Sequence, residues 1–213
     1  MQYLWINPVS AGMCEEDSLK RFLERHGLTR VECRGDWGRI VRERYEASLR
    51  AGVTLADARC PEAVRLLEEI QKEPENESGI ENLKVAPIEP ILLHCARELS
   101  TRPDLADGEK IITTPCQSLA VLGNSLGLEN TRFIAWNRLA GGEVCVRAIE
   151  DSPIPPGYFA GICRKDGQAA KVESVSSSEK IRAYVESGSW KQDLLELLYC
   201  KDGCHHGDGV QTE

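Results

Sequence analysis

Short apolar runs alternate along this chain with longer segments in which apolar residues recur every three or four positions. The first pattern is typical of buried strands and the second of amphipathic helices. The apolar runs predict strands at residues 3–6, 29–33, 53–55, 83–85, 110–113, 131–136 and 194–199. The periodic segments predict helices at residues 15–27, 37–50, 61–70, 88–99, 119–126 and 177–186.

Residues that commonly cap helices mark several of these boundaries. Gly27 and Gly188 follow periodic segments, where a glycine often ends a helix. Pro61 stands at a first helical position, which proline favours because its missing N–H group is not needed there. Ser176 and Glu179 match the capping box, in which the serine caps the helix and a glutamate follows three residues later.

Strands and helices that alternate in this way predict an α/β fold with open parallel sheets flanked by helices. We expect one domain over residues 1–213, made of two fused Rossmann-like sub-lobes at approximately 1–110 and 111–213. Glycine and proline pairs break residues 140–170 into short pieces, which predicts a small β-rich excursion. Residues 73–81 are polar and acidic and predict an exposed linker.

Charge and composition exclude several classes of function. The 26 basic and 34 acidic residues give a net charge of -8, and no stripe of Lys and Arg interleaved with aromatic residues occurs, so nucleic acid is not expected as a partner. No apolar run approaches the roughly 20 residues that cross a bilayer, so no membrane partner is expected either. Nine cysteines, an odd number, and no secretory leader pattern argue against a disulfide framework and predict a reducing cytoplasm.

Four cysteines lie in three short loops that follow predicted strands: Cys60, Cys116, Cys200 and Cys204. Ligand sites of open α/β folds lie at the carboxyl ends of strands. Thiolates are soft ligands, and four of them satisfy one [4Fe–4S] cluster or one tetrahedral zinc ion. Zinc sites commonly use closely spaced pairs, whereas only Cys200 and Cys204 are close in sequence, so the spacing favours the cluster.

The five remaining cysteines are expected to be small buried hydrophobic residues: Cys14, Cys33, Cys95, Cys145 and Cys163. A reactive thiol needs a basic partner that lowers its pKa. His94 does not supply one to Cys95, because adjacent residues on a helix point about 100° apart.

The cysteine loops together resemble the catalytic domain of the iron-only ([FeFe]) hydrogenases and related hydrogenase-like iron–sulfur proteins. Cys60-Pro61 matches the family's first motif, Pro115-Cys116 the second, and Cys200-Lys201-Asp202-Gly203-Cys204 the third. The resemblance covers residues 53–209 and implies an iron-only-hydrogenase-like fold. It also implies that the four cysteines hold a [4Fe–4S] cluster, the last of them bridging in the family to a two-iron subsite.

Several positions depart from the family pattern. Arg59 stands where active hydrogenases have the cysteine that transfers protons, and Gln117-Ser118 follow Cys116 in place of the family's subsite-binding lysine. Asp202 and Asp208 replace residues that are usually glycine. The resemblance therefore implies cluster binding without hydrogenase activity, in electron transfer or redox sensing for a partner such as a ferredoxin or an oxidoreductase.

Two other classes of function stay open from the residues alone. One is a metalloenzyme that acts on a small substrate beside the cluster, with His205 or His206 as an acid or a ligand. The other is a structural or assembly module that holds zinc or no metal. Arg59, Lys201 and Asp202 flank the cysteines, where they either tune a cluster's potential or form a solvated loop rim.

Overall fold

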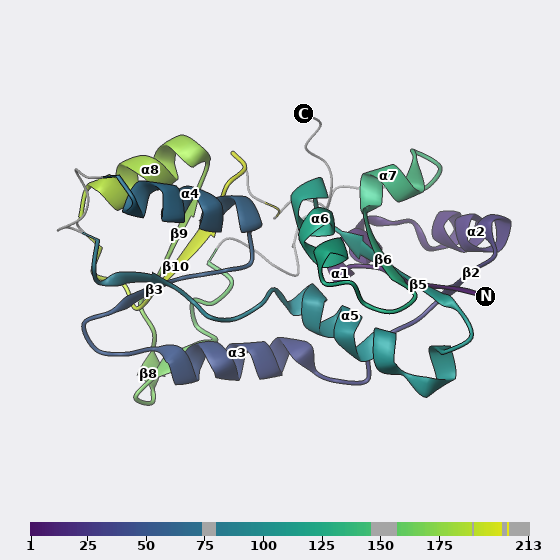
Figure 1. Ribbon diagram of the computed structural model, residues 1–213, viewed down its shortest axis with the longest axis horizontal. Helices are drawn as coiled ribbons and strands as arrows, with labels where there is room; N and C mark the ends of the chain where they lie inside the picture. The colour runs from purple at the N-terminus through teal and green to yellow at the C-terminus, as the bar shows by residue number, and fades with distance from the viewer. Residues whose placement is uncertain (74–79, 146–156, 189, 202–203, 205–213) are drawn as a thin grey trace. The chain divides into compact units, whose positions relative to one another are not determined.

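The computed structural model describes residues 1–73, 80–145, 157–188, 190–201 and 204 (Figure 1). The chain divides into two compact units. Unit 1 contains Met1–Asp36, Leu92–Ile154 and Cys204–Glu213, and unit 2 contains Trp37–Ile91 and Pro155–Gly203. Each unit is therefore assembled from segments that are not contiguous in sequence.

Unit 1 is built on a four-stranded parallel sheet with the order β2-β1-β5-β6. Its strands are β1 (Gln2–Trp5), β2 (Leu28–Arg30), β5 (Glu109–Thr114) and β6 (Thr131–Ala135). Its helices are α1 (Pro8–Met13), α2 (Glu16–His26), α5 (Ile91–Thr101), α6 (Gln117–Ser125) and α7 (Trp136–Ala140). Helix α5 belongs to unit 1 except for its first residue, and a 3-10 turn at Pro103–Leu105 follows it. The chain leaves β1 toward β2 and leaves β5 toward β6, so the connections diverge at the centre of the sheet, where α/β folds place ligands.

Unit 2 contains a second four-stranded parallel sheet, in the order β4-β3-β10-β9. Its strands are β3 (Thr54–Ala56), β4 (Leu83–Val85), β9 (Val172–Ser176) and β10 (Leu194–Leu198), and its helices are α3 (Trp37–Ser48), α4 (Pro61–Gln71) and α8 (Ser178–Glu186). A small hairpin joins β7 (Arg164–Lys165) and β8 (Gln168–Ala169). Leu194 and Leu195 of β10 pair with Leu55 and Ala56 of β3, which places two strands far apart in sequence side by side.

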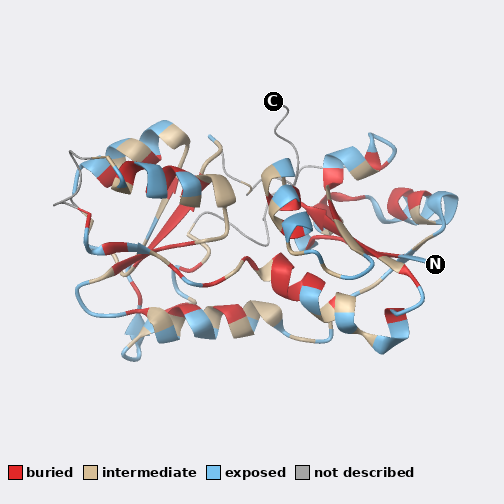
Figure 2. Cartoon of the chain, viewed as in Figure 1, coloured by how far each residue is buried: buried red, intermediate tan, exposed pale blue. Residues whose placement is uncertain are grey.

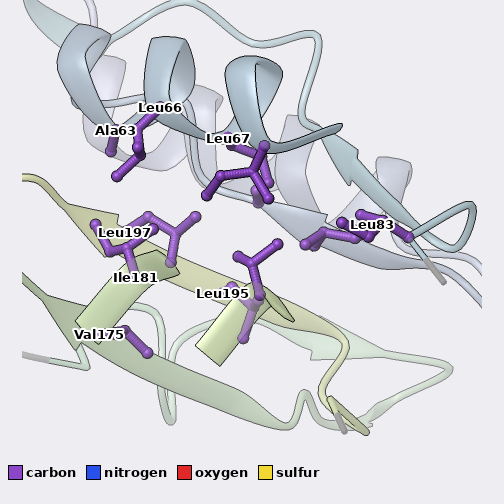
Figure 3. Close-up of a cluster of buried hydrophobic side chains, with 12 residues drawn as sticks. Ala63, Leu66, Leu67, Leu83, Val175, Ile181, Leu195 and Leu197 are labelled. Carbon is purple, nitrogen blue, oxygen red and sulfur yellow. The ribbon is translucent and has the colours of Figure 1, made fainter. Parts of the chain in front are cut away.

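The sheet of unit 2 is covered on both faces. On one face α4 and α8 pack against β10, and Leu66 and Leu67 of α4 point toward Leu195 and Leu197 (Figure 3). On the other face Val41 and Tyr45 of α3, and Leu49 directly after it, pack with Leu55 and Leu194. Both central strands are buried along their whole length (Figure 2), as expected for a parallel sheet between two helical layers.

The predicted α/β class with parallel sheets flanked by helices is confirmed, and most predicted elements are present. Gly27 ends α2 in the left-handed conformation (φ 60°), and Pro61 opens α4, both as predicted. No helix in the described ranges has the length and apolar character needed to cross a membrane. The predicted acidic linker and β-rich excursion fall largely on residues 74–79 and 146–156, outside the described residues; the β7–β8 hairpin lies in the remainder of the excursion.

Four boundaries differ from the predictions. Ser177, not Ser176, caps α8: its hydroxyl accepts the Lys180 N–H at 3.3 Å, which leaves Glu179 one position short of a capping box. Trp136 begins α7 instead of ending a strand. Helix α5 starts three residues later than predicted, immediately after Pro90, because a residue that precedes proline disfavours the helical conformation. The sub-lobe boundary placed at residue 110 falls inside β5.

One helix of unit 1 depends on a residue without a side chain. A Cβ atom at Gly123 of α6 would overlap the ring of Phe133 on β6. Gly123→Ala gains about 1 kcal/mol of helix propensity but forces overpacking that costs about 1–3 kcal/mol. We expect a net loss of stability in chemical denaturation. Val121→Ala, on the exposed face of the same helix, should leave stability unchanged or slightly raised; equal effects for the two variants would contradict the close packing.

Candidate functional site

The turn after β3 is fixed by the buried carboxylate of Asp57, which is 1% exposed. Its Oδ1 accepts the backbone N–H of Arg59 at 2.9 Å and the hydroxyl of Tyr45 at 2.8 Å. An aspartate that accepts the N–H two residues later closes an Asx turn. This turn presents Cys60 at the carboxyl end of the strand.

Cys60 caps the N-terminus of α4 and lies among backbone donors. Its carbonyl accepts the N–H of Val64 at 3.1 Å, and the backbone amides of Tyr199, Ala63 and Glu62 lie near enough to its sulfur to lower the pKa of the thiol. Burial raises the pKa of the Cys60 thiol, and these amides oppose that shift without cancelling it. The sulfur therefore sits where amide dipoles favour a negative charge, although the free thiol keeps its proton.

Cys200 lies close to Cys60 because β3 and β10 are parallel neighbours that end at the same edge of the sheet. Burial raises the pKa of the Cys200 thiol, and the neighbouring Cys60 raises it further. Both side chains are half-buried. Unit 2 thus brings two of the four predicted ligands together as a pair.

The other two predicted ligands belong to unit 1. Cys116 follows β5 and caps α6, and the hydroxyl of Thr114 donates to the Cys116 carbonyl at 2.8 Å. Cys116 and Cys204 are both half-buried. His205, His206, Asp202 and Asp208 lie outside the described residues.

The carboxyl edge of the sheet in unit 1 is also polar, at the point where the connections diverge. Asn7 follows β1, donates its N–H to the hydroxyl of Thr113 at 2.8 Å and caps α1 by accepting the Val9 N–H at 2.8 Å. Ser10 and Thr114, like Asn7 and Thr113, are buried. In the sequence, Asn7 stands between an apolar run and Pro8. This position predicts the end of a strand but no role for the Asn7 side chain.

The described residues contain no group of three or more His, Cys, Asp or Glu side chains arranged to hold a metal ion. Cys60 and Cys200 still fit two positions of a thiolate ligand set. They are adjacent, half-buried and, at Cys60, surrounded by amides that can hydrogen-bond a metal-bound sulfur.

Arg59 lies in a buried ionic network rather than on a solvated loop rim, so that interpretation was wrong. Its Nε pairs with Oδ2 of Asp57, and its Nη2 lies 3.4 Å from Oε1 of Glu196. The guanidinium also lies 4.9 Å from the ring centroid of Phe159. Burial lowers the pKa of Arg59, but its attraction to Asp57 and Glu196 outweighs burial and leaves the pKa raised.

Glu196 is wholly buried in the middle of β10. Its Oε1 accepts the N–H of Phe159 at 2.7 Å. Its Oε2 and the Nη2 of Arg59 are buried without a hydrogen-bond partner among the described residues. The network therefore carries two carboxylates and one cation in an apolar surrounding, directly beside Cys60.

Sequence reasoning missed Asp57, Tyr45 and Glu196. A signal existed for Glu196, which is the single charge within the run Leu-Leu-Glu-Leu-Leu, because a charge in a buried strand requires a partner. Of the five cysteines predicted to be buried, Cys145 is exposed and Cys33 is half-buried, so the prediction was wrong for these two. It was correct for Cys14, Cys95 and Cys163.

No family model, no curated protein and no solved structure matches this chain.

Proposed function

We propose that the chain is an iron–sulfur protein in which Cys60, Cys116, Cys200 and Cys204 bind one [4Fe–4S] cluster. Its role is electron transfer or redox sensing for a partner, such as a ferredoxin or an oxidoreductase. The observation that carries the proposal is the Cys60–Cys200 pair, with backbone amides near enough to the Cys60 sulfur to lower its pKa. Two of the four cysteines belong to each unit.

The chemistry of the pair supports a cluster ligand role. Thiolates hold iron–sulfur clusters, and hydrogen bonds to sulfur help to set their reduction potential. Cys60 and Cys116 each cap a helix, where unpaired amides and the helix dipole favour an anionic group. When bound, the cluster takes up and releases single electrons. Cys60 and Cys200 would hold it together with the other two cysteines, and the amides of Glu62, Ala63 and Tyr199 would favour its negative charge.

The resemblance to the iron-only hydrogenase catalytic domain also supports the proposal. Arg59 argues against hydrogenase activity. The position of the family's proton-transferring cysteine is occupied by a guanidinium that pairs with Asp57 and Glu196. Arginine keeps its proton at all ordinary pH values, so it cannot relay one. We therefore propose a role in electron transfer, in a reducing cytoplasm that keeps the thiols free.

The proposal is tested by measuring iron, acid-labile sulfide and zinc in protein purified without oxygen. We expect about four irons and four sulfides per chain, as one cube requires, and a reduced-cluster signal in electron paramagnetic resonance. Hydrogen evolution from the loaded protein would contradict the electron-transfer role. Stoichiometric zinc without sulfide, or no metal at all, would exclude the cluster and leave a structural module.

A further inference from the structure

A second pair of cysteines, remote in sequence from the proposed ligands, lies in contact within unit 1. Cys33 follows β2, and Cys95 lies on α5. The Cys33 thiol donates to the Cys95 carbonyl at 3.9 Å, and Cys33 lies close enough to raise the pKa of the Cys95 thiol. The two residues are thus neighbours, although both cysteines are free.

Hydrogen bonds from α5 and from the residue that follows it hold the loop on both sides of Cys33. The Glu98 carboxylate accepts the N–H groups of Arg34 at 2.6 Å and Gly35 at 3.0 Å. The Arg102 guanidinium donates to the carbonyl of Glu32 at 2.6 Å. These three hydrogen bonds hold Cys33 beside Cys95 before any bond between the sulfurs forms, which lowers the entropic cost of forming it.

The two thiols differ in access to solvent. Cys33 is half-buried, whereas Cys95 is 4% exposed. Arg102 lies on the same side of the pair as Cys33, where its guanidinium donates to the carbonyl of the preceding residue, Glu32, at 2.6 Å. The hydrogen bond with Cys33 and burial both raise the pKa of Cys95. This asymmetry suits an accessible attacking cysteine and a buried resolving cysteine.

The pair lies close in sequence to the two points at which the chain changes from one unit to the other. The chain leaves unit 1 after Asp36 and returns to it at Leu92. Cys33 and Cys95 therefore lie within a few residues of the two connections that bound the inserted segment Trp37–Ile91. A disulfide between them would link the unit 1 residues that precede this segment to those that follow it.

We propose that Cys33 and Cys95 are a redox-sensitive pair that forms a reversible disulfide when the protein reacts with hydrogen peroxide. The Cys33 thiolate attacks the O–O bond and becomes a sulfenic acid, while the other oxygen leaves as water after protonation. The Cys95 sulfur then attacks the Cys33 sulfur, loses its proton and releases a second water. Two thiols are oxidised by two electrons, one peroxide is reduced to two waters, and a cellular dithiol reverses the change.

The test treats the full-length protein with one equivalent of hydrogen peroxide, blocks free thiols and digests it with trypsin without reductant. Cys33 falls in the peptide 31–34 and Cys95 in the peptide 85–97, each with one cysteine. We expect these two peptides linked, two hydrogens lighter than their sum, and separated again by a dithiol. Peroxide treatment that links other cysteines, or oxidises Cys33 without linking it to Cys95, would overturn the proposal.

Two variants of the pair and one control variant make the readout specific. Cys33→Ser and Cys95→Ser should each abolish the link, whereas Cys145→Ser, at an exposed cysteine outside the pair, should retain it. The disulfide should also raise the thermal midpoint of the wild type by roughly 5–10 °C, a shift that adding dithiol removes and that neither pair variant shows. Iron binding is independent of this pair, so unchanged iron content in both variants separates this result from the proposed function.

Discussion

Asp57→Ala is expected to lower the free energy of unfolding by about 3–5 kcal/mol, because it leaves the cation of Arg59 buried without its main partner. Glu196 compensates only in part, since its Oε1 lies 3.4 Å from Nη2 and already accepts the N–H of Phe159. The Tyr45 hydroxyl and the Arg59 N–H lose their acceptor as well. Equilibrium unfolding in urea, followed by circular dichroism, measures the loss.

Two comparison variants isolate the buried charge. Tyr45→Phe removes one hydrogen bond to Asp57 and should cost only about 1 kcal/mol. Glu143→Ala breaks an ion pair with Arg25 on the surface, where pairs contribute little, and should leave stability essentially unchanged. If Asp57→Ala were no more destabilising than Glu143→Ala, the network would not be a buried one.

Cys60→Ser and Cys200→Ser are each expected to remove most of the iron and sulfide from protein purified without oxygen. Each variant replaces a soft thiolate of the proposed ligand set by a hydroxyl, a poor ligand for iron–sulfur clusters. The same loss is expected for Cys116→Ser and Cys204→Ser. Metal and sulfide analysis with the visible absorption of the cluster measures the effect.

The matched control is Cys145→Ser, which changes an exposed cysteine outside the proposed set. It should retain the wild-type iron and sulfide content. If it lost iron to the same extent as Cys60→Ser, the assignment of the four ligands would be wrong. Circular dichroism of each variant distinguishes loss of the cluster from loss of the fold.

The Asp57 network and the proposed ligand pair share one turn. Asp57 closes the turn, Arg59 stacks over Phe159, and Cys60 is the next residue. A change at Asp57 is therefore expected to disturb Cys60 as well, so Asp57→Ala should also reduce iron retention. Asp57→Asn, which keeps the oxygen that accepts the Arg59 N–H, should retain more iron than Asp57→Ala.

The local elements of this protein could be predicted from the order of its residues. Helix α4 could be predicted because Pro61 and the spacing of Leu66, Leu67 and Ile70 act within a few residues of one another. The same holds for α2 and its Gly27 cap and for the apolar run that forms β10. The placement of Cys60, Cys116 and Cys200 after strands followed directly from these elements.

Which of these residues lie next to one another depends on how the elements pack. An apolar strand does not encode its neighbours, because backbone hydrogen bonds between strands are alike whatever the side chains. The pairing of β3 with β10 brings Cys60 to Cys200 and Arg59 to Glu196, and the packing of a loop on α5 brings Cys33 to Cys95. A solvated loop rim was one interpretation of Arg59, but its guanidinium is buried and paired with Asp57 and Glu196. A charge removed from water needs such a partner, and the fold determines which one is near.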